Sequence, residues 1–377
     1  MRVTIDGIIY QRRPSGGISR IYNEILPLMC GMDETLAIDL LVDPGRGPLK
    51  QSLPTHQRIN PVHRRIADLT ARVHPVSWLP PQLWYKVARL ISNYTGGNPG
   101  KNAIWHTTFY THCKGWPGYR IVTVYDMISE LFPQPYNRSI RQAKEATLPQ
   151  SDVIICISER TRQDLLEYYS QLDTSQTYVI PLGVSEIFRP LSTAERVVLP
   201  LPVTASYILY VGGRGGIHKN FDRLLQAYSQ WKHHKDIQLV VVGRIWSSQE
   251  EMRLAELKLE NHVKLLNDVD DEMLLQLYNQ AEAFVYPSLY EGFGIPILEA
   301  MKCACPVIAA HIPTSTEVGG ECPIYFDPLN IDSLINAFDR VLAEGRTSER
   351  IQIGLEQAKR YTWGKTAQAT LAVYRSL

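Results

Sequence analysis

The feature of the sequence that most constrains its fold is a repeated alternation of short apolar runs with helical patterns. Runs such as IVTVYD and DVIICIS alternate with helical patterns such as ERTRQDLLEYY, and the alternation begins again at YILYVGG. Continuous apolar runs of this kind are typical of parallel strands buried on both faces. Two such series predict an α/β protein with two facing Rossmann-like domains, whose ligands bind at the carboxyl ends of the strands.

The length and the breaks in the pattern indicate where the domains meet. A chain of 377 residues is too long for one ordinary core, so two domains are expected. The stretch 180–203 is rich in proline and lacks a helical period, which predicts a linker. Near the start, RVTIDGIIY is predicted to be a strand and GGISRIYNEILPLM a helix.

Charge and cysteine content exclude several classes of protein. The net charge of +1 gives no field that would favour nucleic acid. The six cysteines show no paired zinc spacing, and the lone pair Cys303 and Cys305 is expected to pack as small apolar side chains, so we predict reduced thiols in a cytosolic protein. We expect neither a signal peptide nor a membrane span, because no apolar run reaches about 18 residues.

The stretch PSLYEGFGIPILEAM, residues 287–301, combines glycines, a helix start and two acids. Glycines let a backbone approach a ligand closely, and a helix start binds anions, so a phosphate is expected here. Glu299 is then placed for the neutral hydroxyls of a ribose, and Glu291 for a sugar beyond the phosphate. The alternative interpretation is a plain glycine turn with solvated acids.

The loop YVGGRGGIHKN places cations among glycines after a strand. Gly213 and its neighbours give a flexible backbone, and Arg214 and Lys219 suit a diphosphate. The pattern is not the G-x-G-x-x-G of a dehydrogenase, and the sequence has no P-loop motif.

Three further candidates lie in the first domain. Gly16 and Gly17 form another point of close approach between a strand and a helix. His106 and Asp126 each follow an apolar strand. A structural role for His106 and a capping role for Asp126 are the alternatives.

Residues 51–100 hold six Lys or Arg and one acid, with Trp78, Trp84 and Tyr85 among them. Basic residues interleaved with aromatic ones suit an anionic membrane surface. An ordinary solvated face around a helical insertion is the alternative.

At this point the chain resembles the retaining glycosyltransferases of family 4, which have the GT-B fold. The stretch PSLYEGFGIPILEAM is similar to that family's E-x7-E signature, and the likeness continues through YVGGRGGIHKNFDRLLQAY, DDEMLLQLYNQAEAFVYPS and YTWGKTAQATLAVY. It covers essentially the whole second domain. The first domain is similar more loosely, at SGGISR, VTVYDM, ISERTRQDL and VIPLGVSEIFRP.

The resemblance implies roles for these residues in binding a nucleotide-sugar donor. Glu299 would bind the ribose and Glu291 the transferred sugar, while Arg214 and Lys219 neutralise the leaving diphosphate and Gly17 approaches it from the first domain. The other donor contacts would be Gly213, Gly292, Phe293, Gly294 and Ile295. No cofactor or metal is expected, because the cations replace a divalent ion.

The resemblance also implies an organisation and a reaction. The first domain, 1–187, would serve the acceptor, 188–360 would bind the donor, and a last helix within 361–377 would cross back to the first domain. Many family members have His-Asp where this chain has Tyr125 and Asp126, so a histidine's catalytic role is absent or passes to His106. Gly16, Tyr125 and Asp126 are the expected contacts to acceptor or sugar.

The motifs SGGISR and VTVYDM resemble those of bacterial mannosyl- and rhamnosyltransferases of surface-polysaccharide synthesis. We therefore expect sugar transfer, from GDP-mannose, to a saccharide or lipid-linked saccharide in the cytoplasm, at the inner membrane face. A sugar-nucleotide epimerase, a phosphorylase and a non-catalytic sugar-nucleotide binder are the alternatives. The phosphorylase is disfavoured, since no lysine site for pyridoxal stands out.

Overall fold

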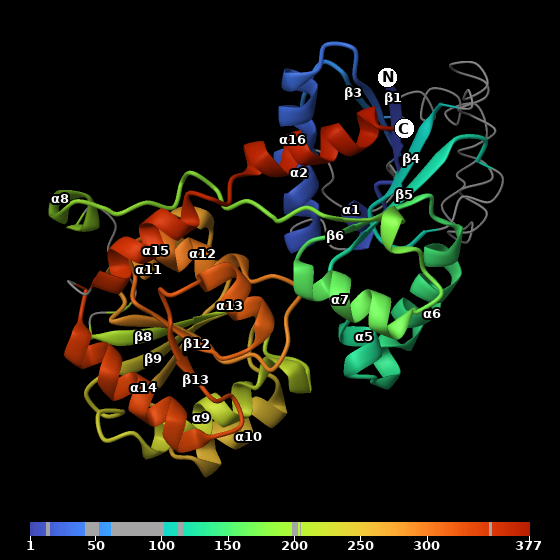
Figure 1. Ribbon diagram of the computed structural model, residues 1–377. Coiled ribbons are helices and arrows are strands. Elements are labelled where there is room, and N and C mark those ends of the chain that lie inside the picture. Colours follow the sequence, from blue (N-terminus) through green and yellow to red (C-terminus); the bar gives the residue numbers. More distant parts are fainter. Residues whose placement is uncertain are drawn as a thin grey trace, which may run out of the picture. The chain divides into compact units, whose positions relative to one another are not determined.

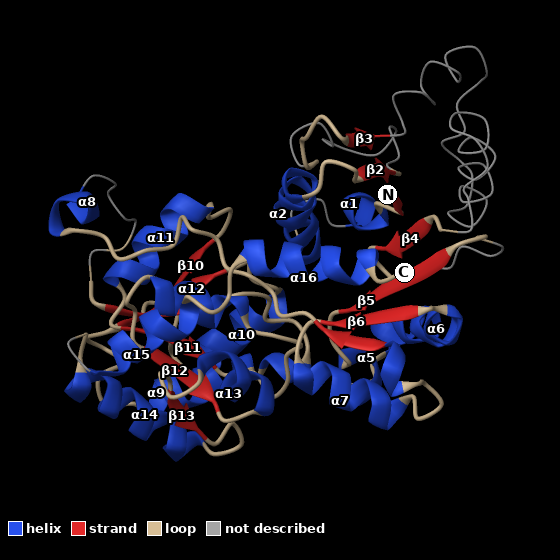
Figure 2. Ribbon diagram, turned by 45° about the horizontal axis from the view of Figure 1, so that its top comes forward, coloured by secondary structure: helices blue, strands red, loops and turns tan. Residues whose placement is uncertain are grey.

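The computed structural model describes residues 1–12, 16–41, 53–61, 102–111, 116–197, 203, 205–346 and 349–377. These residues form two compact units, Met1–Leu182 with Trp363–Leu377 (unit 1) and Gly183–Thr362 (unit 2). The chain thus changes unit after residue 182 and again after residue 362, where the sequence analysis expects changes after 187 and 360. Each unit carries helices on both faces of a central sheet (Figures 1 and 2).

The described strands of unit 1 form a parallel sheet in the order β3-β2-β1-β4-β5-β6-β7. They are β1 (Arg2–Ile5), β2 (Ala37–Leu40), β3 (Ile59–Pro61), β4 (Ile104–Thr107), β5 (Tyr119–Val124), β6 (Val153–Cys156) and β7 (Thr177–Val179). Among the described residues of unit 1, the α-helices are α1 (Ile8–Arg12), α2 (Gly17–Met32), α5 (Ile128–Leu131), α6 (Arg138–Thr147), α7 (Glu159–Tyr168) and α16 (Trp363–Arg375).

The described strands of unit 2 also pair in parallel, in the order β10-β9-β8-β11-β12-β13. They are β8 (Tyr207–Val211), β9 (Gln238–Val242), β10 (Val263–Leu266), β11 (Ala283–Tyr286), β12 (Val307–Ala310) and β13 (Ile324–Phe326). Its α-helices are α8 (Thr193–Val197), α9 (Phe221–Gln230), α10 (Ser248–Glu256), α11 (Asp271–Gln280), α12 (Ile295–Lys302), α13 (Pro313–Gly319), α14 (Ile331–Glu344) and α15 (Glu349–Ala358).

Both sheets reverse their strand order once, between β1 and β4 in unit 1 and between β8 and β11 in unit 2. Ligands of doubly wound sheets bind outside the carboxyl ends of the strands at such a switch point. The predicted parallel α/β architecture is confirmed, and it directs attention to the loops after these four strands.

The core of unit 2 is built around large aromatic side chains on one face of its sheet. Trp231, at the end of α9, is fully buried, and its ring centre lies 5.1 Å from that of Phe338 on α14. The indole N–H of Trp231 donates to Asp339 at 2.8 Å, so its polar atom is satisfied. Truncating such a side chain typically costs about 3–5 kcal/mol, so the contact of Trp231 with α14 contributes substantially to the stability of unit 2.

The prediction of one strand over RVTIDGIIY is wrong in its second half. Strand β1 ends at Ile5, and α1 begins at Ile8. Gly7 lies between them with φ 57°, and the carboxylate of Asp6 accepts a hydrogen bond from the backbone N–H of Ile8 at 3.3 Å. A left-handed glycine and an aspartate turn therefore end the strand.

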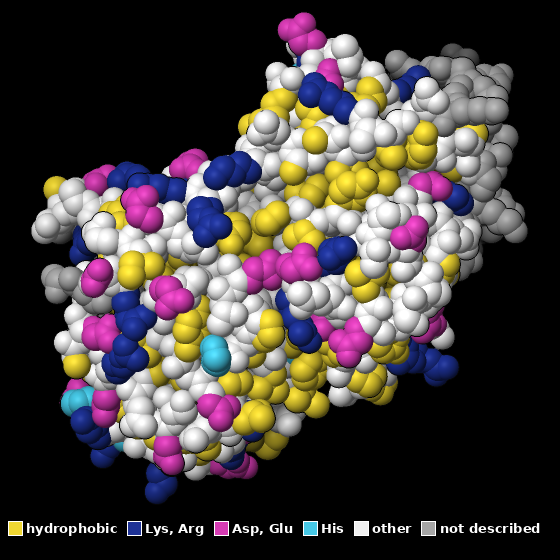
Figure 3. All heavy atoms as spheres, viewed as in Figure 1, with side chains coloured by type: hydrophobic (Ala, Val, Ile, Leu, Met, Phe, Trp, Pro, Cys, Tyr) yellow, Lys and Arg dark blue, Asp and Glu magenta, His cyan; other side chains and the backbone are white. Residues whose placement is uncertain are grey.

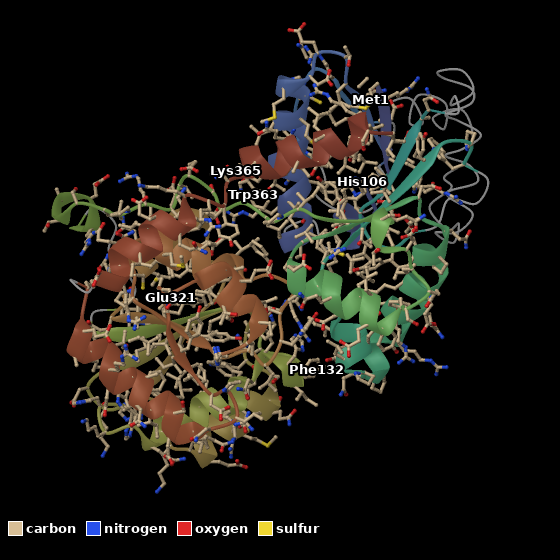
Figure 4. The ribbon with its side chains drawn as sticks, in the orientation of Figure 1. Met1, His106, Phe132, Glu321, Trp363 and Lys365 are labelled. Atoms are coloured by element: carbon tan, nitrogen blue, oxygen red, sulfur yellow. The ribbon has the colours of Figure 1, made fainter. Side chains whose placement is uncertain are left out.

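The C-terminal helix α16 belongs to unit 1, where it packs on α2 (Figures 1 and 2). Trp363 and Lys365 mark its start in Figure 4. Arg375 forms an ion pair with Asp33 at 2.9 Å, and the hydroxyl of Tyr374 lies 2.6 Å from Nδ1 of His106. Polar contacts thus fix the far end of this helix.

The two segments in which the chain changes unit are held close together on both sides of the change. Within unit 2, the backbone N–H of Val184 donates to the carbonyl of Tyr361 at 3.3 Å, and Val184 forms a parallel bridge with Thr362. Within unit 1, the hydroxyl of Thr366 donates to the carbonyl of Pro181 at 2.8 Å. Unit 2 therefore begins and ends at neighbouring points.

Candidate active site

The switch point of unit 2 brings a lysine and a glutamate together. Strands β8 and β11 are neighbours, and the loops that follow them carry Lys219 and Glu291. Nζ of Lys219 donates to Oε1 of Glu291 at 2.7 Å, and the hydroxyl of Ser288 donates to the same oxygen at 2.6 Å. The lysine side chain is 23% exposed and the glutamate side chain 10% exposed, so the pair lies at the edge of the protein interior.

Asn220 fixes the loop that carries Lys219. It has φ 56°, and its side-chain amide donates to the carbonyls of Pro287 at 3.0 Å and Pro328 at 2.8 Å. The backbone N–H of Leu289 also donates to the carbonyl of His218 at 2.7 Å. These bonds tie the loop after β8 to the loop after β11, so the lysine is presented to Glu291 by a fixed backbone.

The glycine turn leads into helix α12, and the sequence predicts a helix start at this place. Gly294 has φ 131°, which strongly favours glycine, and Pro296 lies in the first turn of the helix. The ring of Phe293 is buried against Tyr361, with ring centres 5.7 Å apart. The helix start can therefore offer its backbone N–H groups and its positive dipole end to an anion, while the side chain of Phe293 supports the turn from inside.

Glu299 lies on the buried side of α12. It is 4% exposed, and its Oε2 accepts a hydrogen bond from the hydroxyl of Tyr278, on α11, at 3.1 Å. A buried carboxylate needs such a donor, because an unpaired charge in the interior is very costly.

Arg214 and Lys219 form ion pairs with different acids in this structure. Its Nε donates to Glu250 at 2.6 Å, another of its nitrogens donates to the carbonyl of Arg244 at 2.7 Å, and its guanidinium lies 4.3 Å from the ring centre of Trp246. A third nitrogen lies against Gly243, where a Cβ would be only 2.7 Å from it. The two predicted cations therefore have separate acidic partners.

The ion pair with Arg214 controls the protonation of Glu250. Burial works against the charged form, but hydrogen bonds from Arg214 and Ser247 outweigh it and hold the pKa of Glu250 below its usual value. Glu250 thus stays negatively charged and partly neutralises the positive charge of Arg214.

In unit 1, His106 is buried and hydrogen-bonded through both ring nitrogens (Figure 4). Nδ1 lies 2.6 Å from the hydroxyl of Tyr374, and Nε2 lies 2.8 Å from the hydroxyl of Thr123. Burial lowers the pKa of His106 to about 3, so the ring is neutral at ordinary pH. This placement favours the structural alternative for His106 over the catalytic role.

The loop after β5 carries the two other predicted contacts of unit 1. The hydroxyl of Tyr125 is buried, 2.9 Å from that of Tyr22, and donates to the carbonyl of Thr108 at 3.1 Å. The carboxylate of Asp126 accepts a hydrogen bond from the backbone N–H of Ile128, the first residue of α5, at 2.9 Å, and its side chain is 35% exposed. Asp126 is thus partly exposed to solvent, whereas Tyr125 is buried.

A buried ion pair supports that loop. Nζ of Lys144 donates to Glu130 at 2.9 Å and to the backbone carbonyl of Asp126 at 2.6 Å, and the side chains of Lys144 and Glu130 are fully buried. Removing one partner of a buried pair typically costs about 3–5 kcal/mol. The sequence analysis missed this pair, since nothing in the sequence marks Lys144 as buried.

Other predictions concern metal, thiols and membrane. Within the described part of the chain no group of three metal-binding side chains occurs, and its five cysteines are buried and not disulfide-bonded. None of the described helices is long and apolar enough to cross a membrane. The basic segment 51–100 lies outside the described residues except for 53–61. On the face drawn in Figure 3, side chains of both charge signs are interspersed.

Comparison with solved structures defines the class of fold. The structure resembles sucrose-phosphate synthase from Thermosynechococcus elongatus, with a TM-score of 0.76 at 22% identity over 100% of this chain and 98% of that one. It also resembles Anabaena Alr3699/HepE in complex with UDP and glucose, with a TM-score of 0.71 at 18% identity over 100% and 99% of the two chains. The fold is the predicted GT-B fold.

Sequence comparison gives the family. The model of the glycosyl transferases group 1 matches residues 192–357. O-antigen chain mannosyltransferase B of Escherichia coli is 30% identical over 275 residues, 68% of this chain and 71% of that protein. The serotype-specific mannosyltransferase WbdA of Escherichia coli is 25% identical over 96% of this chain, which spans only 45% of that protein. The chain belongs to the group 1 glycosyltransferases, which confirms the resemblance read from its motifs.

Proposed function

We propose that this protein is a retaining, metal-independent glycosyltransferase of family 4 that moves mannose from GDP-mannose to a saccharide or lipid-linked saccharide in polysaccharide synthesis. The choice of mannose follows the two relatives described above, which are named as mannosyltransferases. The observation that carries the proposal is the Lys219–Glu291 pair at the switch point of unit 2.

The chemistry of that pair suits a nucleotide-sugar donor. Lys219 and the N–H groups at the start of α12 would stabilise the charge that develops on the leaving diphosphate. Glu291, held by Ser288 and Lys219, would accept hydrogen bonds from the transferred sugar. When the diphosphate binds, Lys219 would divide its donors between Glu291 and the phosphate oxygens.

Arg214 is proposed to add charge from the neighbouring glycine loop. Since its guanidinium is paired with Glu250, it would reach a diphosphate only by exchanging that partner. On the acceptor side, we propose that Gly16, Tyr125 and Asp126 line the site.

The central test is sugar transfer by the purified chain. Nucleoside diphosphate sugars with guanine, uracil, adenine and thymine bases are each incubated with a mannose-terminated oligosaccharide, and the product is identified by mass spectrometry. We expect transfer from GDP-mannose, and Lys219→Ala to lower turnover at least ~100-fold. Lys235→Ala is the matched control, because Lys235 is an exposed lysine in the loop between α9 and β9, and it should leave turnover unchanged.

The outcomes separate this proposal from its alternatives. An epimerised donor in the absence of acceptor would identify an epimerase, and binding without turnover of any donor would identify a non-catalytic binder. Retention is tested by the anomeric coupling in the product's NMR spectrum. Full activity in excess EDTA is the expected result for metal independence.

We also propose that the protein works in the cytoplasm, in contact with the inner face of the membrane through residues 51–100. Flotation with vesicles of anionic lipid measures this directly. Binding at low salt that is lost at high salt is expected, and equal recovery with neutral vesicles would contradict the electrostatic contact.

A further inference from the structure

Tyr278 is a buried polar side chain that the proposed mechanism leaves unused. It lies on α11, is fully buried, and its hydroxyl donates to Oε2 of Glu299 at 3.1 Å. Glu299, on α12, is itself only 4% exposed. The tyrosine therefore contacts the predicted ribose-binding acid from inside the protein.

The position of that hydroxyl is fixed by the packing of its ring. The ring centre of Tyr278 lies 5.9 Å from that of Phe188 and 5.5 Å from that of Phe284, with both pairs edge-to-face. Its backbone carbonyl accepts a hydrogen bond from Arg346 at 2.9 Å. A tyrosine held in this way offers its hydroxyl at a fixed place, so its hydrogen bond favours one position of the Glu299 carboxylate.

In the hydrogen bond between these two side chains, Tyr278 is the donor and Glu299 the acceptor. Burial, and then the charge of Glu299, raise the pKa of Tyr278 well above its ordinary value, so the phenol keeps its proton and acts as the donor. An ionised carboxylate offers about four acceptor positions, and the hydrogen bond from Tyr278 occupies one of them.

We propose that Tyr278 is a positioning residue for the donor's ribose, orienting the Glu299 carboxylate to accept hydrogen bonds from the 2′- and 3′-hydroxyls. The inference rests on the proposed function, which places the ribose of a nucleoside diphosphate at Glu299. The competing explanation is that the hydrogen bond only ties α11 to α12, and it predicts no dependence on the ribose hydroxyls.

The test is calorimetric titration of the full chain with GDP and with 2′,3′-dideoxy-GDP, and with the matching UDP and ADP pairs. For the base that binds, the wild type should bind the ribonucleotide at least ~10-fold more tightly than the dideoxy form. Tyr278→Phe should weaken ribonucleotide binding about 3- to 10-fold and leave dideoxy binding unchanged. Equal weakening of both ligands, or no weakening, would overturn the inference.

Tyr207→Phe is the matched control. Tyr207 is also buried, and its hydroxyl donates to the carbonyl of Leu277 on the same helix at 2.8 Å, so its loss perturbs α11 without touching Glu299. We expect Tyr207→Phe to keep the wild-type ratio of the ribonucleotide and dideoxynucleotide affinities. A ratio reduced as in Tyr278→Phe would contradict the inference. In a Glu299→Ala background, Tyr278→Phe should have no further effect on ribonucleotide binding.

Two results with the wild type alone distinguish a failure of the ribose assignment from a failure of the proposed function. Equal affinity for ribo and dideoxy forms would overturn the role of Glu299, and with it that of Tyr278, while leaving sugar transfer intact. Binding of none of the three ribonucleoside diphosphates would overturn both the inference and the proposed function.

Discussion

At the scale of single residues, Gly17 is a glycine with open space beside it among the described residues. Its backbone is not left-handed, and a Cβ placed on it would meet no atom of the described residues within 4 Å. Glycines usually serve a positive φ or a close approach by another part of the chain. Neither is seen at Gly17 among the described residues, and the space beside this glycine agrees with the proposal that it lies close to the donor's phosphates.

Gly17→Ala should therefore leave folding intact and impair catalysis. We expect an unchanged or slightly higher melting temperature, because alanine favours a helix over glycine by about 0.5–1 kcal/mol. Turnover should fall at least ~10-fold, since a methyl group would displace the bound phosphates. Scanning calorimetry and steady-state kinetics measure the two effects.

Gly31→Ala is the control for that experiment, because Gly31 lies on the same helix and a Cβ there also meets no atom within 4 Å. It should keep full turnover. Equal kinetics for both variants would remove the proposed phosphate contact at Gly17.

Sequence reasoning places residues in loops well and predicts their partners poorly. Lys219 and Glu291 were expected at one ligand, and the structure joins them. Arg214 was expected to serve the same diphosphate as Lys219, but it pairs with Glu250 in the first turn of α10, and no local pattern in the sequence encodes that approach. Tyr278 falls on the apolar face of its helix, so its periodicity indicates a core residue and nothing about its hydroxyl.

At the scale of elements, local chemistry explains what the sequence analysis missed. The expected linker 180–203 contains helix α8, which begins at Thr193. The hydroxyl and N–H of Ser192 both bond to the carboxylate of Glu195, at 2.8 and 2.9 Å. The pattern Ser-x-x-Glu is a known helix-start signal, so this helix was predictable from the sequence despite the surrounding prolines.

The stability of the folded protein should depend on pH through His106, which contacts Tyr374 of α16. The unfolded chain binds a proton at this histidine near pH 6.5, whereas the folded protein does so only near pH 3. Between these values the unfolded state holds more protons, so stability falls as the pH falls from about 6.5 towards 3. The slope attributable to His106 approaches about 1.4 kcal/mol per pH unit.

Urea unfolding between pH 4 and 7 tests this expectation. His106→Gln removes the titrating ring, so its unfolding free energy should depend less steeply on pH than that of the wild type. Tyr374→Phe removes a hydrogen bond to the ring and keeps the ring itself. It should lower stability by about 1 kcal/mol at every pH and preserve the slope. Parallel curves for wild type and His106→Gln would contradict the argument.

At the scale of the whole molecule, unit 2 should fold by itself. It has its own parallel sheet and its own core around Trp231, and the family match, 192–357, lies entirely within it. A fragment of residues 183–362 should unfold cooperatively and bind GDP with an affinity within about tenfold of the full chain if unit 2 holds most donor contacts. Circular dichroism and calorimetry provide the measurements, and a fragment that folds without binding would show that unit 1 supplies essential donor contacts.

The close pairing of the two segments where the chain changes unit has a consequence for how such a protein can diversify. Because Val184 and Thr362 are bridged, the two ends of unit 2 lie side by side, and unit 2 is a continuous cassette between two segments of unit 1, its host. Exchanging that cassette for its counterpart from a relative requires two joints at the same spot and leaves the host's β1 and α16 untouched. If unit 2 binds the donor, as proposed, such an exchange would change the donor preference and keep the acceptor.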